Sequence, residues 1–382
     1  MTGVRRMKQL VSIGCCWVFL SAFAPEPRLS YDLRDVWGDG SGHPQAAPSA
    51  QPVRLRFDVS GMLDEGTKPA AARTPPSAPA AARGPAPRVV AALNVDVGAI
   101  ADSNINNATN LPFILVNSEA GAVPVPLPAE SRRRSGVGFS ASSSASLDLR
   151  LSNEAVLATD AEASVVDQRG SANDDASLLV AVGPEMSWGG SSLGSLQLLA
   201  FQRWYGGTTL SAGTGVRGAM QIPAGQGRLL RFLVEGRWFE SDYGPELAGA
   251  MGSASVTLEA LLGRTMSGSA TVYVRRQSLG SPAFSSTELG VHAGFSRYLG
   301  DRLVASLSLG ISRATFDAPQ EWLSSDPHRD GRLHGSLSAR TRQPLLWSLH
   351  PNLSYMFGRT ASTVPFYDAD RHALRIGVDT SF

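Results

Sequence analysis

One glycine-rich segment has the spacing of a dinucleotide-binding loop. Gly213, Gly215 and Gly218 fit the pattern G-x-G-x-x-G. That chemistry needs a strand-to-helix turn within a βαβ unit, where the amide groups of the helix N-terminus meet the pyrophosphate. The residues around these glycines alternate between apolar and polar types, which is typical of a strand. We therefore expect these glycines to be small residues on the polar face of a strand, where a β-barrel would have its lumen. We expect no nucleotide cofactor.

The histidines do not have the spacing of a metal site. No two of them form the H-x-x-x-H pair of a zinc-binding helix, and no carboxylate cluster accompanies them. His334 with Ser336, and His350, could supply the His–Ser pair of an outer-membrane lipase, but they fall on the polar face of their strands. We expect no catalytic residue, metal or other cofactor. The six histidines are His43, His292, His328, His334, His350 and His372. A cluster of acidic and basic residues in a connecting segment is interpreted as exposed to solvent. Its members are Asp326, His328, Arg329 and Asp330.

Charges of both signs also lie on the polar faces of the expected strands. Mixed signs on one face favour ion pairs between neighbouring strands, which would brace the wall. They are also compatible with an electric field across an open channel. Of these two interpretations we favour bracing. The residues are Asp96, Asp148, Arg150, Asp160, Glu162, Arg217, Arg231, Glu235, Arg237, Glu259, Arg275, Arg340, Arg375 and Asp379.

The composition limits the classes of protein to consider. The 382 residues include 34 Lys and Arg against 33 Asp and Glu, a formal net charge of +1. Such a balance argues against nucleic acid as a partner, because phosphate binding needs a basic excess. Only 18% of residues are charged, below the roughly 25% of an ordinary soluble domain. Few charges, 39 glycines and no long apolar run beyond the N-terminus fit a membrane barrel better than soluble domains.

Apolar and polar residues alternate along most of the chain after residue 88. In 303–312, the odd-numbered positions are apolar and Ser306, Ser308, Gly310 and Ser312 lie between them. Successive side chains of a strand point to opposite faces, so one face of each strand is apolar and the other small and polar. A soluble sandwich would carry many Lys and Glu on its outer face. The pattern instead predicts a wet lumen with lipid outside.

The alternation divides this region into about fourteen strands, each long enough to cross a bilayer. Short and long connections alternate between the strands, as in outer-membrane barrels, whose periplasmic turns are short and external loops longer. An even number of strands leaves both termini on the periplasmic side. Expected tight turns include Gly300-Asp301 and Gln343-Pro344, and Trp204–Thr208 is one of the expected longer loops. The expected strands are 89–100, 136–150, 154–166, 176–188, 191–203, 209–222, 228–239, 251–262, 264–277, 286–299, 302–313, 331–342, 347–359 and 371–382.

The segments before the barrel predict export. Residues 1–24 have a basic start, an apolar run from Leu10 to Phe23 and small residues at a cleavage position, which indicates a signal peptide rather than a membrane anchor. Cys15 and Cys16, the only cysteines, lie within it. Residues 25–87 are rich in Ala and Pro, which is typical of a disordered spacer. The domains expected are therefore a signal peptide (1–24), a periplasmic spacer (25–87) and an outer-membrane barrel (88–382).

The final strand has the pattern of a sorting signal. It alternates up to a terminal aromatic residue, and looks like the signal that the barrel assembly machinery reads. The residues of this pattern are Leu374, Ile376, Val378, Thr380 and Phe382. This predicts a location in the outer membrane of a Gram-negative cell, with the spacer and the C-terminus in the periplasm.

Two segments, one at each end of the barrel, resemble the C-terminal barrel of the surface lipoprotein assembly modifier family. The first has the pattern Asp-Ser-Asn-x-Asn-x-Ala, matched by Asp102, Ser103, Asn104, Asn106 and Ala108, with Asn107 between the last two. The second is a loop before the last strand, matched by Ser362, Pro365, Tyr367, Asp368 and Arg371, with Thr363 where the family has Asn. The resemblance implies a fourteen-stranded barrel that moves lipoproteins or related secreted proteins to the cell surface.

Several expectations about function follow from the resemblance. The main one is an outer-membrane translocation pore for exported lipoprotein or protein cargo, with no enzymatic activity. The alternatives are a diffusion porin for small solutes and, last, an outer-membrane hydrolase. Family members carry N-terminal tetratricopeptide helices, whereas this sequence has the Ala/Pro spacer there. Either a separate periplasmic helical-repeat protein recognises the cargo, or the barrel has diverged in function. The turn at 102–107 either shapes its loop, since Asn accepts left-handed backbone conformations, or lines and gates the pore exit.

Overall fold

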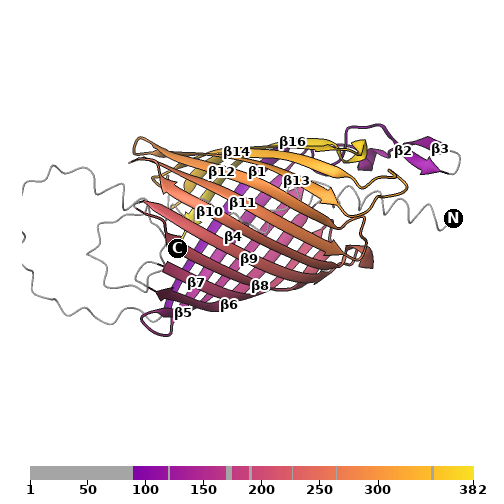
Figure 1. Cartoon of the computed structure of the whole chain (residues 1–382). Coiled ribbons are helices and arrows are strands. Elements are labelled where there is room, and N and C mark those ends of the chain that lie inside the picture. The colour runs from indigo at the N-terminus through magenta and orange to yellow at the C-terminus, as the bar shows by residue number, and fades with distance from the viewer. Residues whose placement is uncertain are drawn as a thin grey trace, which may run out of the picture.

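The computed structural model describes residues 89–118, 121–168, 174–188, 192–225, 227–263, 265–345 and 348–382. Fourteen of the strands in these residues form a closed antiparallel barrel, which confirms the predicted fold class (Figure 1). Among the described residues, no helix is long and apolar enough to cross a membrane. The predicted signal peptide, spacer and cysteines lie outside them.

Each barrel strand has 13 to 16 residues, more than the roughly 9–11 that cross a bilayer at a tilt. The barrel strands are β1 (Val89–Asp102), β4 (Gly136–Arg150), β5 (Ala155–Gln168), β6 (Asp175–Trp188), β7 (Ser192–Tyr205), β8 (Thr208–Pro223), β9 (Arg228–Glu240), β10 (Gly249–Leu261), β11 (Met266–Leu279), β12 (Ser286–Leu299), β13 (Leu303–Phe316), β14 (Arg329–Thr341), β15 (His350–Ser362) and β16 (Ala369–Ser381). Three short 3-10 turns, η1 (Ala129–Ser131), η2 (Pro245–Leu247) and η3 (Pro365–Tyr367), lie in the connections.

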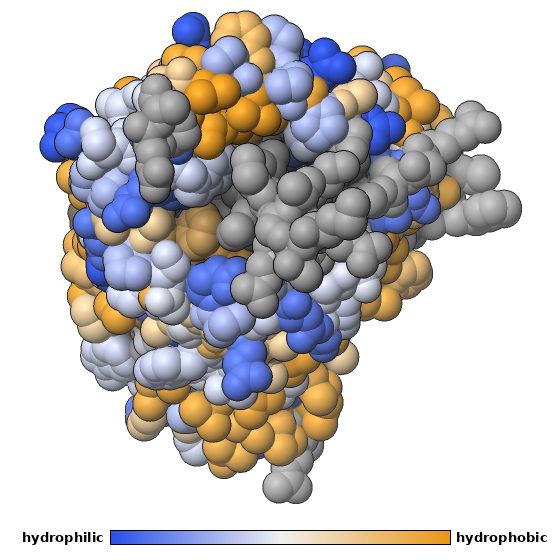
Figure 2. Space-filling model, turned by 90° about the vertical axis from the view of Figure 1, so that its right-hand side faces the viewer, coloured by the Kyte–Doolittle hydropathy of each residue, from blue (hydrophilic) through white to orange (hydrophobic). Residues whose placement is uncertain are grey.

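The two ends of the barrel differ. A separate hairpin of β2 (Phe113–Ser118) and β3 (Gly121–Pro126) projects beyond one end, which we call the loop end (Figure 1). β1 begins and β16 finishes at the opposite end, which we call the terminal end (Figure 1). Figure 2 looks onto the loop end and shows many hydrophilic residues on this face, with hydrophobic residues gathered at its lower edge.

The strands expose their apolar face and bury their polar face, as the alternation predicts. Leu289 and Ile311 are 60% and 58% exposed, whereas Glu288 and Ser296 are 5% and 1% exposed. Small hydroxyl groups pair across strands on the buried side; the Oγ atoms of Ser296 and Ser306, for example, lie 2.8 Å apart. An inside-out pattern of this kind needs an apolar solvent around the barrel and a polar interior.

Two connections differ from the predicted alternation of lengths. Trp204–Thr208 is not a loop, because β7 extends to Tyr205 and β8 begins at Thr208. Gly206 and Gly207 have φ values of 56° and 79°, so two residues complete the turn. The connection at Gln343-Pro344 is not tight; it extends over residues 342–349 and closes with a hydrogen bond from the Leu345 N–H to the Leu349 carbonyl, 2.8 Å.

The largest apolar cluster lies above the loop end of the barrel. It joins the β2–β3 hairpin to the connection between β15 and β16 and consists of Ala108, Ile114, Leu127, Val364, Phe366, Tyr367 and Ala369. Trp322 and Leu323, from the connection between β13 and β14, pack against it. The cluster gives the loop end its own small core.

Candidate functional site at the barrel seam and the lumen wall

The barrel closes where β1 meets β16, and this pairing is short. β1 pairs with β4 along Val89–Asp102, but with β16 only along Asn94–Asp102. Hydrogen bonds between the backbone groups of Leu93 and Phe382, 3.1 and 2.8 Å, end the pairing. We call the β1–β16 pairing the seam. Side-chain contacts add to its backbone hydrogen bonds at two levels, near the loop end and within the lumen.

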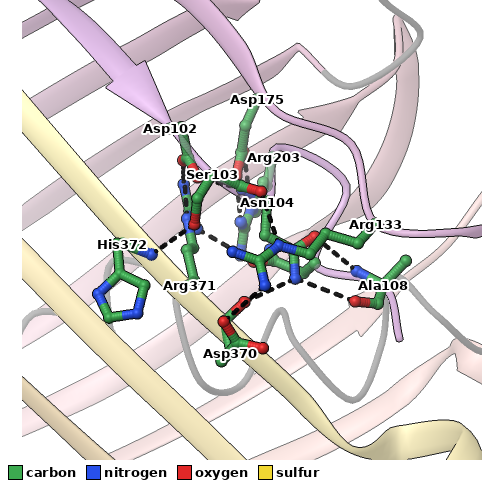
Figure 3. Close-up of polar contacts among 11 residues, drawn as sticks. Asp102, Ser103, Asn104, Ala108, Arg133, Asp175, Arg203, Asp370, Arg371 and His372 are labelled. Atoms are coloured by element: carbon green, nitrogen blue, oxygen red, sulfur yellow. Dashed lines mark hydrogen bonds and ion pairs between the residues drawn. The ribbon is translucent and has the colours of Figure 1, made fainter. Parts of the chain in front are cut away.

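The two segments that resemble the family motifs meet at the loop end of the seam (Figure 3). Asp102 is the last residue of β1, and its carboxylate is fully buried. Arg371 in β16 donates its Nε–H to the Asp102 Oδ2, 2.7 Å, and a second guanidinium nitrogen binds the same oxygen. The remaining Nη1 donates to the Asn107 Oδ1, 3.2 Å. The ion pair therefore joins the first strand to the last.

Asn104 organises the loop that follows β1. Its side chain is fully buried, and its amide nitrogen donates to the carbonyls of Ala108 and Asp370, 3.0 and 2.9 Å. Its Oδ1 accepts the Ala108 N–H at 3.0 Å, while its own backbone N–H donates to the Asp102 Oδ1 at 2.8 Å. One amide thus holds its own loop and also binds β16 (Figure 3).

Further contacts fix both arms of this loop. Asn106 donates to the Arg132 carbonyl at 2.7 Å and accepts the Arg134 N–H at 3.1 Å. Arg133 donates its Nε–H to the Ser103 carbonyl, 2.9 Å, and its Nη1 lies 2.6 Å from the Asp370 Oδ2. The Ser103 Oγ accepts the His372 N–H, 2.8 Å. Asn107 takes a φ of 48°, a conformation that Asn tolerates well.

The rest of the second motif shapes the loop above the seam. The Asp368 Oδ1 accepts the Ser362 N–H at 2.6 Å, and the Ser362 Oγ accepts the Val364 N–H at 3.2 Å. Pro365 opens the turn η3, which places Tyr367 in the apolar cluster with 1% of its surface exposed. Arg371 is the residue of this motif that binds Asp102 and Asn107 of the first motif, and Ser362, Pro365 and Asp368 shape the loop before it.

The group predicted to be solvated, 326–330, is only partly so. His328 and Asp330 are 1% and 0% exposed. The His328 ring is stacked between Phe316, with ring centroids 3.6 Å apart, and Tyr367, at 4.6 Å. Burial, together with the nearby charge of Arg332, lowers the pKa of His328 to about 3. Because the Tyr367 hydroxyl also binds Gln320, this loop and the second motif form one unit.

Ion pairs line the lumen wall, some within one strand and others between strands. Glu235 binds the Nε atoms of Arg217 and Arg237 at 2.7 and 2.6 Å. Glu288 accepts a hydrogen bond from the Tyr273 hydroxyl, 2.9 Å. The other pairs are Arg332–Glu288 at 2.9 Å, Arg332–Asp330 at 3.2 Å, Arg231–Glu259 at 3.4 Å and Arg275–Glu288 at 3.9 Å. Asp148 and Arg150 lie on the same face of β4, buried and half-buried.

One network crosses the lumen side of the seam itself. Arg375 binds Asp96 and also donates to the Ser140 Oγ, 2.7 Å, and to the Asn352 Oδ1, 2.9 Å. The amide nitrogen of Asn352 donates to Asp96, 3.2 Å, and to Asp379, 3.0 Å. Arg340 completes the network by binding Asp379 at 2.6 Å. Without these cations and the amide, Asp96 and Asp379 would face each other directly, since they are register partners.

The residues considered for chemistry contact other groups of the wall. Ser336 pairs its hydroxyl with that of Ser308, 2.7 Å, and His334 stacks on His292 with centroids 5.9 Å apart. His350 contacts the Thr341 carbonyl through Nδ1, 2.9 Å. Gly213, Gly215 and Gly218 all lie within β8. In the described part of the chain, no three His, Cys, Asp or Glu side chains are placed to hold a metal ion.

The model of the family described as "surface lipoprotein assembly modifier" matches residues 92–382, which is almost the whole barrel. The chain belongs to the surface lipoprotein assembly modifier family. As a member of this family with a closed inside-out barrel, it is an outer-membrane protein. Both motif segments lie within the match, so the contacts at the seam are formed by this family's barrel.

Several solved structures have low similarity to this chain. The P. putida toluene transporter TodX has 10% identity and a TM-score of 0.38, covering 76% of this chain and 90% of its own. OccK1 of Pseudomonas aeruginosa has 12% identity and a TM-score of 0.39, covering 76% and 99%. A loop-deletion mutant of OmpT, an outer membrane protein of Vibrio cholerae, has 8% identity and a TM-score of 0.38, covering 78% and 100%. The comparison with curated proteins found no match.

Proposed function

We propose that this protein is a translocation pore that assists the surface display or secretion of lipoproteins or related proteins. The observation that carries the proposal is the family match over almost the whole barrel, from residue 92 to residue 382. The chain's own residues supply a polar lumen and a closed lipid-facing wall. The pore would act without enzymatic chemistry or a bound cofactor, and folding of the cargo outside the cell would favour transport in one direction.

The proposed orientation puts the loop end outside the cell. Barrels of the outer membrane have longer connections outside and shorter turns in the periplasm. The largest connections of this barrel, residues 103–135 and 317–328, both lie at the loop end. The spacer and the C-terminus would then lie in the periplasm. The motif residues around Asn104 and Arg371 would surround the exit of the pore.

The proposed partners follow from this orientation. The barrel assembly machinery would recognise the last strand, whose terminal Phe382 side chain is 75% exposed while its backbone pairs with Leu93. A separate periplasmic helical-repeat protein would deliver the cargo to the terminal end. The cargo would be an exported lipoprotein or another secreted protein.

A diffusion porin remains the second candidate, because a barrel of this size suits both functions. Eight strands enclose an interior that side chains fill, whereas 16–18 strands leave an aqueous channel. Fourteen strands with a polar lining lie near the upper group. The two functions differ in what they carry, so the decisive experiment measures proteins and ions separately.

The experiment compares cells with and without the gene for the surface exposure of lipoproteins encoded beside it. Exposure is measured by protease shaving of intact cells, and a periplasm-facing lipoprotein serves as the control. A translocation pore predicts that one lipoprotein becomes protected in the deletion strain and is restored by the plasmid-borne gene. Unchanged exposure of every candidate, together with a steady conductance of the purified protein in planar bilayers, would establish the porin instead.

The seam motif can be tested in the same assay. Substituting both Asn104 and Asn106 with Ala removes the side chains that hold the loop of residues 103–135. If this loop gates the exit, display of the cargo falls while the amount of barrel in the membrane stays normal. Normal display at a normal barrel level would mean that the motif only shapes the loop.

A further inference from the structure

Three arginines lie on the outward face of the barrel close to the loop end. Arg313 and Arg359 each lie three residues inside the end of their strands, β13 at Phe316 and β15 at Ser362. Arg329 is the first residue of β14, the strand between them. All three side chains are exposed. We call them the arginine belt.

The belt lies directly beside the apolar band that faces lipid. Arg313 pairs in register with Leu289, and Arg359 pairs with Leu333. Leu289 and Leu333 are 60% and 45% exposed, so they belong to the outward apolar face. A charged side chain at the edge of this face lies at the level where hydrocarbon gives way to lipid head groups.

Among the residues that the structure describes, the belt has no acidic partner. In the described residues, no ion pair or side-chain hydrogen bond involves the guanidinium groups of Arg313, Arg329 or Arg359. The carboxylate nearest in register to Arg359 is that of Asp370, which binds Arg133 at 2.6 Å.

A fourth outward arginine shows the contrast. Arg276 lies three residues before the end of β11, at a depth like that of Arg313. Its Nη1 donates to the Asp317 Oδ1 at 2.7 Å. That hydrogen bond lowers the pKa of the Asp317 carboxyl and keeps it ionised. Arg276 is therefore neutralised by the protein, whereas the belt is left for a ligand outside it.

We infer that Arg313, Arg329 and Arg359 bind the phosphate groups of phosphorylated glycolipid in the outer leaflet. A guanidinium group matches phosphate oxygens with paired hydrogen bonds and keeps its charge at every physiological pH. Three such groups on adjacent strands can contact the head group of one lipid or two neighbouring lipids. The inference rests on the proposed orientation, with the loop end outside, and it is independent of any cargo.

The test measures lipid retention by the purified full-length protein. The protein in uncharged detergent is mixed with diphosphorylated lipid A, and bound lipid is counted by native mass spectrometry. The test variant is the triple substitution R313Q, R329Q and R359Q. The matched control is R228Q, R297Q and R302Q, which removes three exposed arginines at the terminal end.

The inference predicts that the wild type and the control retain lipid A and that the belt variant binds it at least about tenfold more weakly. Dephosphorylated lipid A should bind the wild type as weakly as the belt variant binds lipid A. Retention unchanged in the belt variant, or lost equally in the control, would overturn the inference. So would complete displacement by millimolar inorganic phosphate, since the site would then bind free anions and not lipid.

Because binding is measured on purified protein, its outcome does not depend on the display assay. A protein that retains lipid A but displays no cargo would contradict the proposed function alone. A protein that displays cargo without retaining lipid A would contradict the inference alone. The fold of the belt variant is checked by its resistance to sodium dodecyl sulfate before boiling.

Discussion

Arg371 binds Asp102 across the β1–β16 seam, although 269 positions separate the two residues in the sequence. The pair lies at the loop end of the β1–β16 pairing, which is the shorter of the two strand pairings of β1. It therefore contributes to closing the barrel, and it also fixes the position of the loops above. Both members belong to segments that the sequence alone identifies with the family.

Removing one member of this pair should weaken the barrel. In D102N, the Arg371 guanidinium loses the carboxylate it binds, in a site where the Asp102 side chain is fully buried. Breaking a buried pair by removing one partner costs about 3 kcal/mol. The free energy of unfolding in lipid vesicles, from a urea titration, measures this effect. The control R276Q breaks an exposed pair and should change the free energy of unfolding by less than about 1 kcal/mol. Equal effects of D102N and R276Q would mean that the seam pair has no special role.

Asn104 should stabilise the loop of residues 103–135 more than a nearby exposed asparagine does. N104A leaves the Ala108 N–H and the carbonyls of Ala108 and Asp370 without their side-chain partner, a loss of about 2 kcal/mol. We expect proteases to cut the loop of residues 103–135 faster in this variant. Asn110, exposed and with one long contact of 3.4 Å, supplies the matched control N110A. Equal cutting in both variants would contradict the role given to Asn104.

Much of the barrel could be predicted because lipid imposes a simple rule on it. The prediction 286–299 coincides with β12, and 302–313 agrees with β13 to within three residues. Every strand must turn its apolar face outward, so the pattern repeats with period two. The β2–β3 hairpin escaped prediction because it lies outside the barrel, and its apolar residues pack on other loops rather than on lipid.

The candidate site was predictable only in part. The motif residues could be identified, but not their contacts, because the pairing of Asp102 with Arg371 depends on how the barrel closes. His328 was expected in solvent, since a charged and polar segment gives no sign of burial. Its burial arises from Phe316 and Tyr367, which reach it from two other segments. The missed residues Asn352, Gln320 and Arg133 act through side-chain contacts with segments distant in the sequence, which leave no periodic signal.

The lumen ion pairs should act on stability and not on ion selectivity. E235Q removes the anion that lies between Arg217 and Arg237, both of which contact it in the lumen wall. We expect a loss of about 3 kcal/mol in the free energy of unfolding. The reversal potential of the purified protein in a salt gradient should stay unchanged. A shifted reversal potential with unchanged stability would favour a field across an open channel. The control variant is S308A, which removes a small polar group from the same wall.

His328 should remain neutral far below the pH at which free histidine titrates. Its folded pKa of about 3 lies under the usual value of 6.5, because burial and the Arg332 charge disfavour the protonated ring. The unfolded chain binds this proton below pH 6.5 and the folded chain does not. This residue therefore supports the fold fully above pH 6.5 and progressively less toward pH 3. Imidazole 15N shifts of histidine-labelled protein, assigned with H328Q, should show His328 neutral at pH 5; titration near 6.5 would contradict its burial.

The most direct test of the whole account is a scan of single spin labels along β12, from Leu289 to Ser296, in a cysteine-free protein reconstituted in lipid. Collision rates with oxygen, which concentrates in lipid, and with a water-soluble nickel complex report the surroundings of each position. If the apolar face of β12 contacts lipid, Leu289, Val291, Ala293 and Phe295 favour oxygen, and Gly290, His292, Gly294 and Ser296 favour nickel. Uniform collision rates along the strand, or the opposite alternation, would contradict a lipid-facing apolar wall around a polar lumen.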